Sequence, residues 1–393
     1  MSEIKVNSIK GVGASAAAIT VNNTDGTCTA NITNNLSNRN LIINGAMQVA
    51  QRGTSSTTSG YGSVDRFKIL FNNTDEAPTH AQVDLTSSDT GPYESGFRKA
   101  LKITNGNQTS GAGTSDFIKA QQDIEGHNIV NSGWNATDPN SELTISYWVK
   151  SSVAQTFFGR FRAFASTEYE YTYSFALSAN TWTKITKTVP GNSNFSSIPN
   201  TSGKGFFHIW QCFFGTDFTN NKTLDTWAAK DNANKSPDMT STWYTTNDAT
   251  FEITGVQLEV GEHATDFEHR TYAQELELCK RYFFMIGKDS KRNNNRMSFP
   301  FINEAPSNTG GYIDFRFHPE MRATPTATIG AELVLGRPQI DMGNHHVSSF
   351  NDMGAAGCHF FQYTNQTGST ADADKYMRCG HHDDAFAEFS AEL

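Results

Sequence analysis

The chain has 393 residues and a formal net charge of -9, from 31 Lys and Arg against 40 Asp and Glu. This length allows two or three domains with cores of their own, so the chain is not a small scaffold that needs covalent staples. No dense run of Lys or Arg is present, which disfavours a nucleic-acid binder. Aromatic residues make up 12% and charged residues only 18%. This composition favours β-strands, because aromatic side chains suit pleated, half-buried surfaces.

The cysteines and the apolar runs indicate the cellular compartment in which the chain is made. The 5 Cys are widely separated, and no two form a Cys-x-x-Cys pair, so neither a disulfide framework nor a zinc ribbon is indicated. The first residues lack the apolar stretch of a secretory signal, and the aromatic run at residues 206–214 is too short to span a bilayer. We therefore expect synthesis in a cytoplasm and no membrane insertion.

Residues 1–40 are predicted to form an extended arm. The first 60 residues contain no Phe, Tyr or Trp, so this part of the chain lacks the large side chains of an independent core. Short apolar stretches around Ile4, Val6 and Ile9, and again at residues 16–21, are separated by Gly and Asn. This pattern is typical of short strands that become ordered by pairing with a copy of the chain or with a docking protein.

From residue 41 to about 270 the pattern is that of an antiparallel β-sandwich. Apolar residues alternate with polar ones over 143–149 and over 169–175. The run at 206–214 is apolar in both phases, as expected for a central strand covered on both faces. Within 251–260 the apolar phase changes from odd to even at Gly255, which predicts a β-bulge.

One amphipathic helix is predicted next, over residues 271–284. Tyr272, Leu276, Cys279 and Phe283 recur at helical spacing, and Glu277 precedes Arg281 by four residues. Alternation returns at 297–301, 313–317 and 387–393, so residues 285–393 are predicted to form a smaller C-terminal β domain. No repeat with a fixed period is visible, which argues against a propeller or a long solenoid.

Several strings resemble known virion proteins. NLIING at 40–45, QQDIEG at 121–126 and LTISYWVKS at 143–151 resemble strands of carbohydrate-binding-module-like jelly rolls. The strings ITGVQLEVG at 253–261, ATDFEHR at 264–270 and ELELCKRY at 275–282 are similar to the end of the jelly roll and the following helix in bacteriophage tail-fibre proteins. MRATPT at 321–326 resembles a segment of the β domain that follows in those fibres, and SEIKVN at 2–7 resembles a virion-attachment arm.

The resemblance implies a trimeric fibre of the virion, made in the bacterial host cytoplasm. Its arm would dock to a tail or portal-adaptor protein through Ile4, Val6 and Ile9, and its distal parts would reach the host. We expect an all-β protein with an arm (1–40), a jelly roll (41–270), a connecting helix (271–284) and a C-terminal β domain (285–393). The alternative left open is a purely structural collar or capsid-decorating fibre without receptor binding.

The polar insertion at residues 215–250 is the candidate site for a host surface glycan. Sugar recognition needs flat aromatic faces together with planar amide and carboxylate groups. The insertion offers Asn221, Trp227, Trp243 and Tyr244, and long loops on sandwiches often carry binding sites. The alternative is that these aromatic residues anchor the loop onto the sandwich or onto a neighbouring copy.

Other kinds of chemistry are less well supported. Histidines gather at 345–346, 359 and 381–382 beside cysteines, but adjacent strand residues face opposite sides, so no metal site is predicted. No carboxylate pair is set apart as glycoside hydrolysis would require, and no phosphate loop or nucleophile motif is present, so the chain is not expected to be an enzyme. No cofactor is predicted, and a structural calcium ion is left open.

Overall fold

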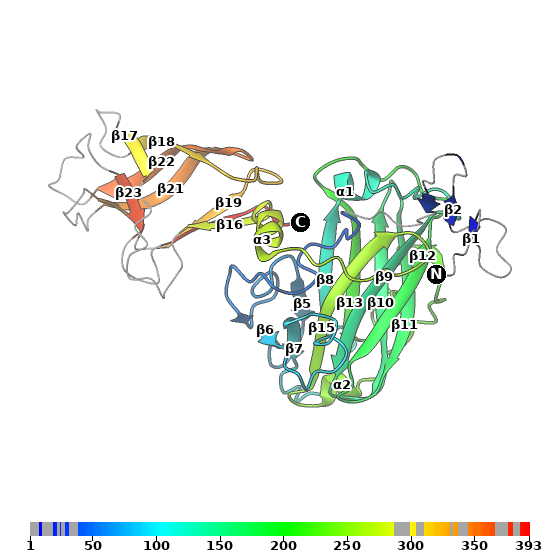
Figure 1. Ribbon diagram of the computed structural model, residues 1–393. Coiled ribbons are helices and arrows are strands. Elements are labelled where there is room, and N and C mark those ends of the chain that lie inside the picture. Colours follow the sequence, from blue (N-terminus) through cyan, green and yellow to red (C-terminus); the bar gives the residue numbers. More distant parts are fainter. Residues whose placement is uncertain are drawn as a thin grey trace.

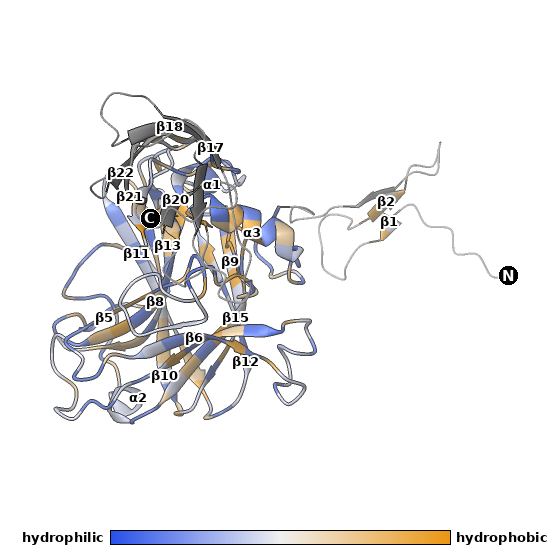
Figure 2. Cartoon of the chain, turned by 90° about the vertical axis from the view of Figure 1, so that its left-hand side faces the viewer, coloured by the Kyte–Doolittle hydropathy of each residue, from blue (hydrophilic) through white to orange (hydrophobic). Residues whose placement is uncertain are grey.

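The computed structural model describes residues 8–9, 19–21, 24, 28–30, 38–286, 299–303, 310–330, 333–336, 345–365, 376–379 and 386–393. Its largest unit is a jelly-roll-like sandwich of two six-stranded sheets (Figure 1). Apolar residues concentrate on the strands of this sandwich (Figure 2). The prediction of an all-β fold is confirmed.

The sandwich consists of a front sheet and a back sheet. The front sheet has the order β14-β11-β10-β13-β8-β5, and the back sheet has the order β12-β9-β15-β7-β6-β4. The front strands are β5 (Lys68–Asn72), β8 (Phe117–Glu125), β10 (Gln155–Phe164), β11 (Glu168–Leu177), β13 (Lys204–Phe214) and β14 (Trp227–Ala229). The back strands are β4 (Ser55–Ser56), β6 (Thr79–Asp84), β7 (Lys99–Thr104), β9 (Glu142–Ser151), β12 (Thr183–Pro190) and β15 (Thr250–Val260).

The strand patterns in the sequence identify the centre of the sandwich correctly. The alternating residues of 143–149 lie on β9, and its apolar members are buried. Strand β13 lies between β10 and β8 and is buried on both faces. Gly255 has a φ of 63°, and the pairing of β15 with β9 shifts between Thr254 and Gln257. The predicted bulge is therefore confirmed, and it depends on glycine because other residues are strained at positive φ.

The connecting helix is shorter than predicted. Helix α3 spans Tyr272–Lys280 and begins with a capping box between Thr271 and Gln274. The prediction of a helix to residue 284 is wrong, because the chain turns into strand β16 (Phe283–Ile286), which pairs with β24 (Ala387–Ser390). The predicted apolar stripe also fails at its start, since Tyr272 is 55% exposed.

Beyond α3 the chain forms the two parts of a C-terminal β region. Strands β16, β24 and β19 (Thr326–Ile329) make a three-stranded sheet. A closed barrel has the order β17-β18-β22-β21-β20-β23. Its strands are β17 (Phe299–Asn303), β18 (Gly310–Arg316), β20 (Leu333–Gly336), β21 (His345–Gly354), β22 (Gly357–Asn365) and β23 (Tyr376–Cys379). Two short helices, α1 (Gly126–Val130) and α2 (Thr242–Thr245), complete the described elements.

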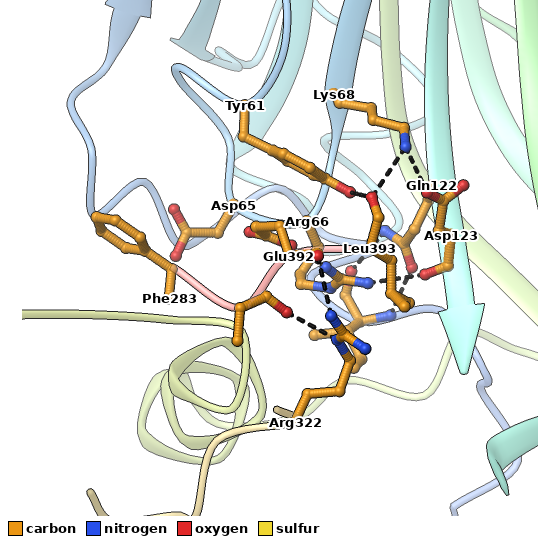
Figure 3. Close-up of polar contacts among 12 residues, drawn as sticks. Tyr61, Asp65, Arg66, Lys68, Gln122, Asp123, Phe283, Arg322, Glu392 and Leu393 are labelled. Carbon is orange, nitrogen blue, oxygen red and sulfur yellow. Dashed lines mark hydrogen bonds and ion pairs between the residues drawn. The ribbon is translucent and has the colours of Figure 1, made fainter. Parts of the chain in front are cut away.

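Residues 390–393 run back from the C-terminal region to the sandwich (Figure 3). The buried guanidinium of Arg66 forms an ion pair with Glu392, and Lys68 donates to the carbonyl of Leu393 at 3.0 Å. Arg322 donates to the carbonyls of Ala391 at 2.7 Å and Glu392 at 3.1 Å, and to Ser202 on the sandwich side at 2.8 Å. We call this set of contacts the junction.

The N-terminal arm is described only in part. Strands β1 (Ser8–Ile9), β2 (Ile19–Val21) and β3 (Cys28–Ala30) form a small sheet of their own, and Figure 1 shows β1 and β2 on the side of the sandwich opposite the barrel. Of the predicted docking residues, Ile9 is 54% exposed, whereas Ile4 and Val6 lie outside the described residues. Among the described helices, none has the length and apolarity needed to cross a bilayer.

Candidate functional site

Strand alternation gives the front sheet an inner and an outer face. On β13, Phe206 and Trp210 belong to the sandwich core, so Ile209 and Gln211 point the other way. The same alternation applies to the neighbouring strands. The outer face therefore carries Lys119, Gln121 and Asp123 from β8, Phe158, Arg160 and Arg162 from β10, and Glu170 and Thr172 from β11.

Strand register brings the polar members of this face together. Gln211 is paired with Phe158 on one side and with Lys119 on the other. Arg160 is paired with Ile209, which lies two residues from Gln211 on the same strand. Diagonal neighbours of this kind lie about 7–8 Å apart at the backbone, within reach of long side chains. The face thus has a polar centre assembled from three strands.

An ion-pair network occupies one side of this centre. Arg160 pairs with the buried Glu170, and Arg162 donates its Nε hydrogen to the same carboxylate oxygen at 2.8 Å. Arg162 also pairs with Glu168 at 3.3 Å. Because both guanidinium groups use one oxygen of Glu170, its other oxygen, Oε2, has no hydrogen-bond partner.

The same region collects buried polar atoms that lack partners. Gln211 is fully buried, and neither its amide nitrogen nor its amide oxygen is hydrogen-bonded. The Nε atom of Arg160 is also unpaired, and so are the side-chain oxygens of Asn234 and Ser236. Most buried polar groups in proteins are hydrogen-bonded, and each one left unpaired costs about 1–3 kcal/mol. These atoms have almost no accessible surface, so the polar centre is covered.

The insertion at residues 215–250 packs along one side of this face. Thr172 donates to the carbonyl of Lys235 at 2.9 Å and accepts at its own carbonyl from Asp225 at 2.8 Å. The Lys235 ammonium lies 4.1 Å from the centre of the Phe218 ring. Phe218 in turn meets the Phe117 ring at 5.7 Å, edge to face. Aromatic rings therefore border the polar centre, as glycan recognition requires.

Crowding of positive charge is visible in the acid–base properties of the lysines. Burial lowers the pKa of Lys119 well below its usual range, and the nearby charge of Arg160 lowers it further. Burial and Arg160 also lower the pKa of Lys235, to about 8, although Glu170 opposes this shift. Both shifts have the sign expected where cations outnumber the carboxylates that could offset them.

The predicted glycan residues are not brought together in one site. Trp243 and Tyr244 are buried in the sandwich core, where the Trp243 indole donates to the carbonyl of Thr250 at 3.0 Å. Neither ring is open to a sugar, so their assignment to the site is corrected: they anchor the insertion. Trp227 is half-buried and donates to the carbonyl of Pro190 at 2.7 Å. Only Asn221 of the four is exposed.

The polar residues of the front sheet are not among those predicted from the sequence. Two signals were present in the sequence. Arg160 and Arg162 are two charged residues within a strand rich in Phe, and Gln211 interrupts the apolar run that was correctly predicted to be central. A polar residue in a strand covered on both faces must find a partner or a function.

A recess lies on the outer face of the back sheet, with a volume of about 270 Å³. Its lining includes Trp148, Lys184 and Phe267. Gly91 packs against the Trp148 ring so closely that an added Cβ atom would lie 2.7 Å from it, which leaves less of the ring for a ligand. None of the residues that line this recess is among those with unpaired buried polar atoms in the described part of the chain. The front sheet is therefore the stronger candidate.

Among the described side chains, no three His, Cys, Asp or Glu are grouped as a metal ion would require. His345 and His346 are neighbours on strand β21, and the His residues at 381–382 lie outside the described ranges.

Comparison with known proteins identifies no family. No protein-family model matches the chain, and no curated protein matches it. Among solved structures, the enzymatically active domain of tailspike protein 4 of bacteriophage CBA120 is 9% identical, covering 56% of this chain and 21% of that chain, with a TM-score of 0.30. A putative sugar binding protein from Bacteroides thetaiotaomicron is 12% identical over 57% of this chain and 100% of that chain, with a TM-score of 0.31.

A third similar structure is the family 11 carbohydrate-binding module of a cellulosomal cellulase from Clostridium thermocellum. It is 10% identical over 54% of this chain and 98% of that chain, with a TM-score of 0.25. Likenesses at this level establish neither a family nor a function. The chain spans about a fifth of the tailspike structure that it matches.

Proposed function

We propose that this chain is a phage virion fibre protein that binds a host surface glycan through the outer face of its front sheet. The observation that carries the proposal is the partly exposed border of that face, where Lys119 lies beside the Phe117 ring and Lys235 beside the Phe218 ring. Ammonium groups can donate to the hydroxyl groups of a sugar. The bordering aromatic rings supply apolar contact for sugar C–H groups. The fibre assignment is supported by the strings in the sequence that resemble tail-fibre proteins.

In this proposal the fibre is a homotrimer whose N-terminal arm docks to a tail or portal-adaptor protein. Ile4, Val6 and Ile9 remain the proposed docking residues. Three copies per fibre, and several fibres per particle, raise the effective concentration of weak sites, so tight binding by one site is not needed. A monomer in size-exclusion chromatography with light scattering would contradict this part of the proposal.

Binding without hydrolysis fits the carboxylates of the front sheet. A glycosidase needs a carboxylic acid with a raised pKa as proton donor. Glu170 is held between Arg160 and Arg162. Burial acts to raise the pKa of Asp123, but Lys68 and Lys204 beside it lower it overall. We infer that Asp123 stays ionised and that both carboxylates serve as acceptors.

A purely structural fibre is the competing proposal. It is favoured by the burial of Trp243 and Tyr244 and by the way the insertion and residues 390–393 pack beside the front sheet. In that case the unpaired polar atoms would be satisfied by ordered water alone.

Two assays on the full chain separate these proposals. The first is an array of bacterial capsular, lipopolysaccharide and teichoic-acid glycans probed with purified protein. The second is adsorption competition, in which host cells are incubated with the protein before phage is added and unadsorbed phage is counted. Retention on the array together with blocked adsorption is the expected result. A folded protein that binds no glycan and leaves adsorption unchanged would favour the structural fibre.

A further inference from the structure

The recess on the outer face of the back sheet lies at the β-bulge of strand β15. Tyr147 of β9 belongs to the sandwich core, so its neighbours Ser146 and Trp148 point to the outer face. Between the partners of these two residues, β15 carries Gly255 and one further residue where β9 has only Tyr147. A Cβ atom added to Gly255 would lie 2.6 Å from the Phe97 ring. The bulge and its glycine therefore shape the recess of about 270 Å³, which Ser146, Trp148 and Phe97 help to line.

Aromatic rings form one wall of the recess. The Phe97 ring meets the Phe267 ring edge to face, with 4.8 Å between their centres, and the His269 ring lies 4.9 Å from the Phe267 ring. A hydrogen bond of 3.1 Å between His269 Nε2 and the carbonyl of Ser95 joins the two segments that carry these rings. Phe267 is half-buried and His269 is exposed. The wall is therefore held in place and remains accessible from solvent.

Two hydrogen-bond donors in the recess are open to solvent. Within the described part of the chain, neither the Ser146 hydroxyl nor the Trp148 indole N–H has a hydrogen-bond partner. Neither atom is among the buried side-chain atoms without partners, so solvent reaches both. Gly91 covers the Trp148 ring along the edge formed by Cε3, Cζ3 and Cη2, which is the edge away from the N–H group. Both donors are therefore free to bind a ligand in the recess.

The rim of the recess carries exposed charged groups of both signs. Lys184 of β12 is paired with Trp148, so the two side chains project from the same face. Lys184 is exposed and forms no ion pair with any described residue. Glu94 and Asp266 are exposed lining residues as well. The rim therefore offers both donors and acceptors, and its carboxylates outnumber its ammonium group, which disfavours an acidic ligand.

The size and the chemistry of the recess fit one sugar unit. Its volume of about 270 Å³ lies just below the range of about 300–1,000 Å³ that is usual for sites of drug-sized ligands. It therefore holds a single ring with its substituents and not several units of a chain. A sugar ring has an apolar C–H face that suits an aromatic wall, and its hydroxyl groups both donate and accept hydrogen bonds.

We propose that the back-sheet recess binds a single non-acidic sugar unit, at the end or at a branch of a glycan. The C–H face of the sugar packs on Phe267, and its hydroxyl groups accept from Ser146, Trp148 and Lys184. Carboxylates of the rim accept from the remaining hydroxyl groups. The recess lies on the opposite sheet from the face described under the proposed function, so this is an additional site that does not depend on that face.

NMR of the full chain, with tryptophan labelled at the indole nitrogen, tests this site. The chain has 6 Trp, and the indole signal that is lost in Trp148→Phe belongs to Trp148. The methyl glycosides of glucose, galactose, rhamnose and N-acetylglucosamine are titrated in turn, and methyl glucuronide is the acidic counterpart of methyl glucoside. We expect at least one neutral glycoside to shift the Trp148 signal with a Kd on the order of 1 mM. The signal of Trp243, which is buried in the core, should stay unchanged.

Variants assign the binding to the recess. Ser146→Ala and Lys184→Gln each remove one donor, and each is expected to raise the Kd by about two- to tenfold. Lys102→Gln is the matched control for Lys184→Gln, because Lys102 lies on β7 of the same sheet but does not line the recess. It should bind like the natural protein. Circular dichroism and melting curves check that each variant is folded.

Three results would overturn the inference. The first is that no neutral glycoside shifts the Trp148 signal at concentrations on the order of tenfold above the expected Kd. The second is that methyl glucuronide binds as tightly as methyl glucoside. The third is that Lys102→Gln weakens binding as much as Lys184→Gln, because the effect is then one of overall charge. None of these results removes the front-sheet proposal, and the glycan array repeated with Lys184→Gln separates the two sites, since binding through the front sheet does not need Lys184.

Discussion

The buried ion pair between Arg66 and Glu392 is expected to hold residues 390–393 against the sandwich. Arg66 is almost fully buried; burial acts to lower its pKa, but Glu392 raises it overall. Arg52 donates to the other carboxylate oxygen of Glu392 at 3.2 Å. Glu392→Gln keeps the size of the side chain and removes its charge. Arg66 then still donates to the carbonyl of Asp123 at 2.7 Å and still lies over the ring of Tyr282.

The magnitude follows from the burial of both partners. Removing one partner of a buried ion pair costs about 3–5 kcal/mol, because the other charge stays behind uncompensated. We take the lower end, about 3 kcal/mol, since Arg66 keeps two favourable contacts after the change. If residues 390–393 detach locally from the sandwich, this loss makes the equilibrium constant for detachment larger by on the order of a hundredfold.

Native-state hydrogen exchange measures this opening directly. The N–H of Ala391 donates to the carbonyl of Tyr282 at 2.8 Å, so its exchange rate reports detachment of the tail. Glu392→Gln should accelerate that exchange on the order of a hundredfold. Glu320→Gln, the same substitution at an exposed site, should not. Equal rates in the two variants would show that the bonds from Arg322 hold the junction and that the ion pair contributes little.

Three further predictions concern pH and the backbone. Burial raises the pKa of Asp65 to about 6, so between about pH 4 and pH 6 the folded protein keeps a proton that the unfolded chain releases. The free energy of unfolding should therefore fall by about 2–3 kcal/mol as the pH rises from about 4 to 6. Asp65→Asn should flatten this part of a profile of melting temperature against pH. Burial lowers the pKa of His208, whose ring is hydrogen-bonded to the Tyr173 hydroxyl at 2.8 Å. The free energy of unfolding should therefore fall as the pH drops below about 6.5. Urea unfolding at pH 7 and at pH 5 should show a smaller difference in stability for His208→Gln than for the natural protein. Gly255→Ala should lower the free energy of unfolding by about 1–3 kcal/mol in the same assay, because Gly255 has a positive φ. Gly354→Ala is the control and should be nearly neutral, because a Cβ atom added there meets nothing within 4 Å.

The sandwich was predictable because its signals are local. Alternating apolar residues identified β9 and β11, and a run that is apolar in both phases identified β13 as central. Both patterns can be seen within one strand, without knowing which strands are its neighbours. The Gly255 bulge was visible as a change of phase within one strand. The end of α3 was not predictable, because Phe283 continues the helical spacing and only pairing with the distant β24 makes it a strand.

The polar centre of the front sheet could not be predicted in the same way. Arg160 and Gln211 come from strands whose adjacency is set by tertiary topology, and nothing in the local sequence pairs β10 with β13. The aromatic residues of the insertion misled the prediction for a related reason. A Trp in a polar loop resembles a ligand platform, but Trp243 is covered because helix α2 turns it into the core.

The polar side chains of the front sheet form two separate ion-pair systems. At the edge that faces the junction, Asp123 is satisfied by Lys68 and Lys204. Toward the opposite edge, one oxygen of Glu170 is shared by two arginines. Among the described residues, six of the eleven unpaired buried side-chain atoms belong to this face or to the insertion. Imperfect packing alone would scatter such atoms over the fold, so their grouping supports the proposal that this part of the sheet does more than pack.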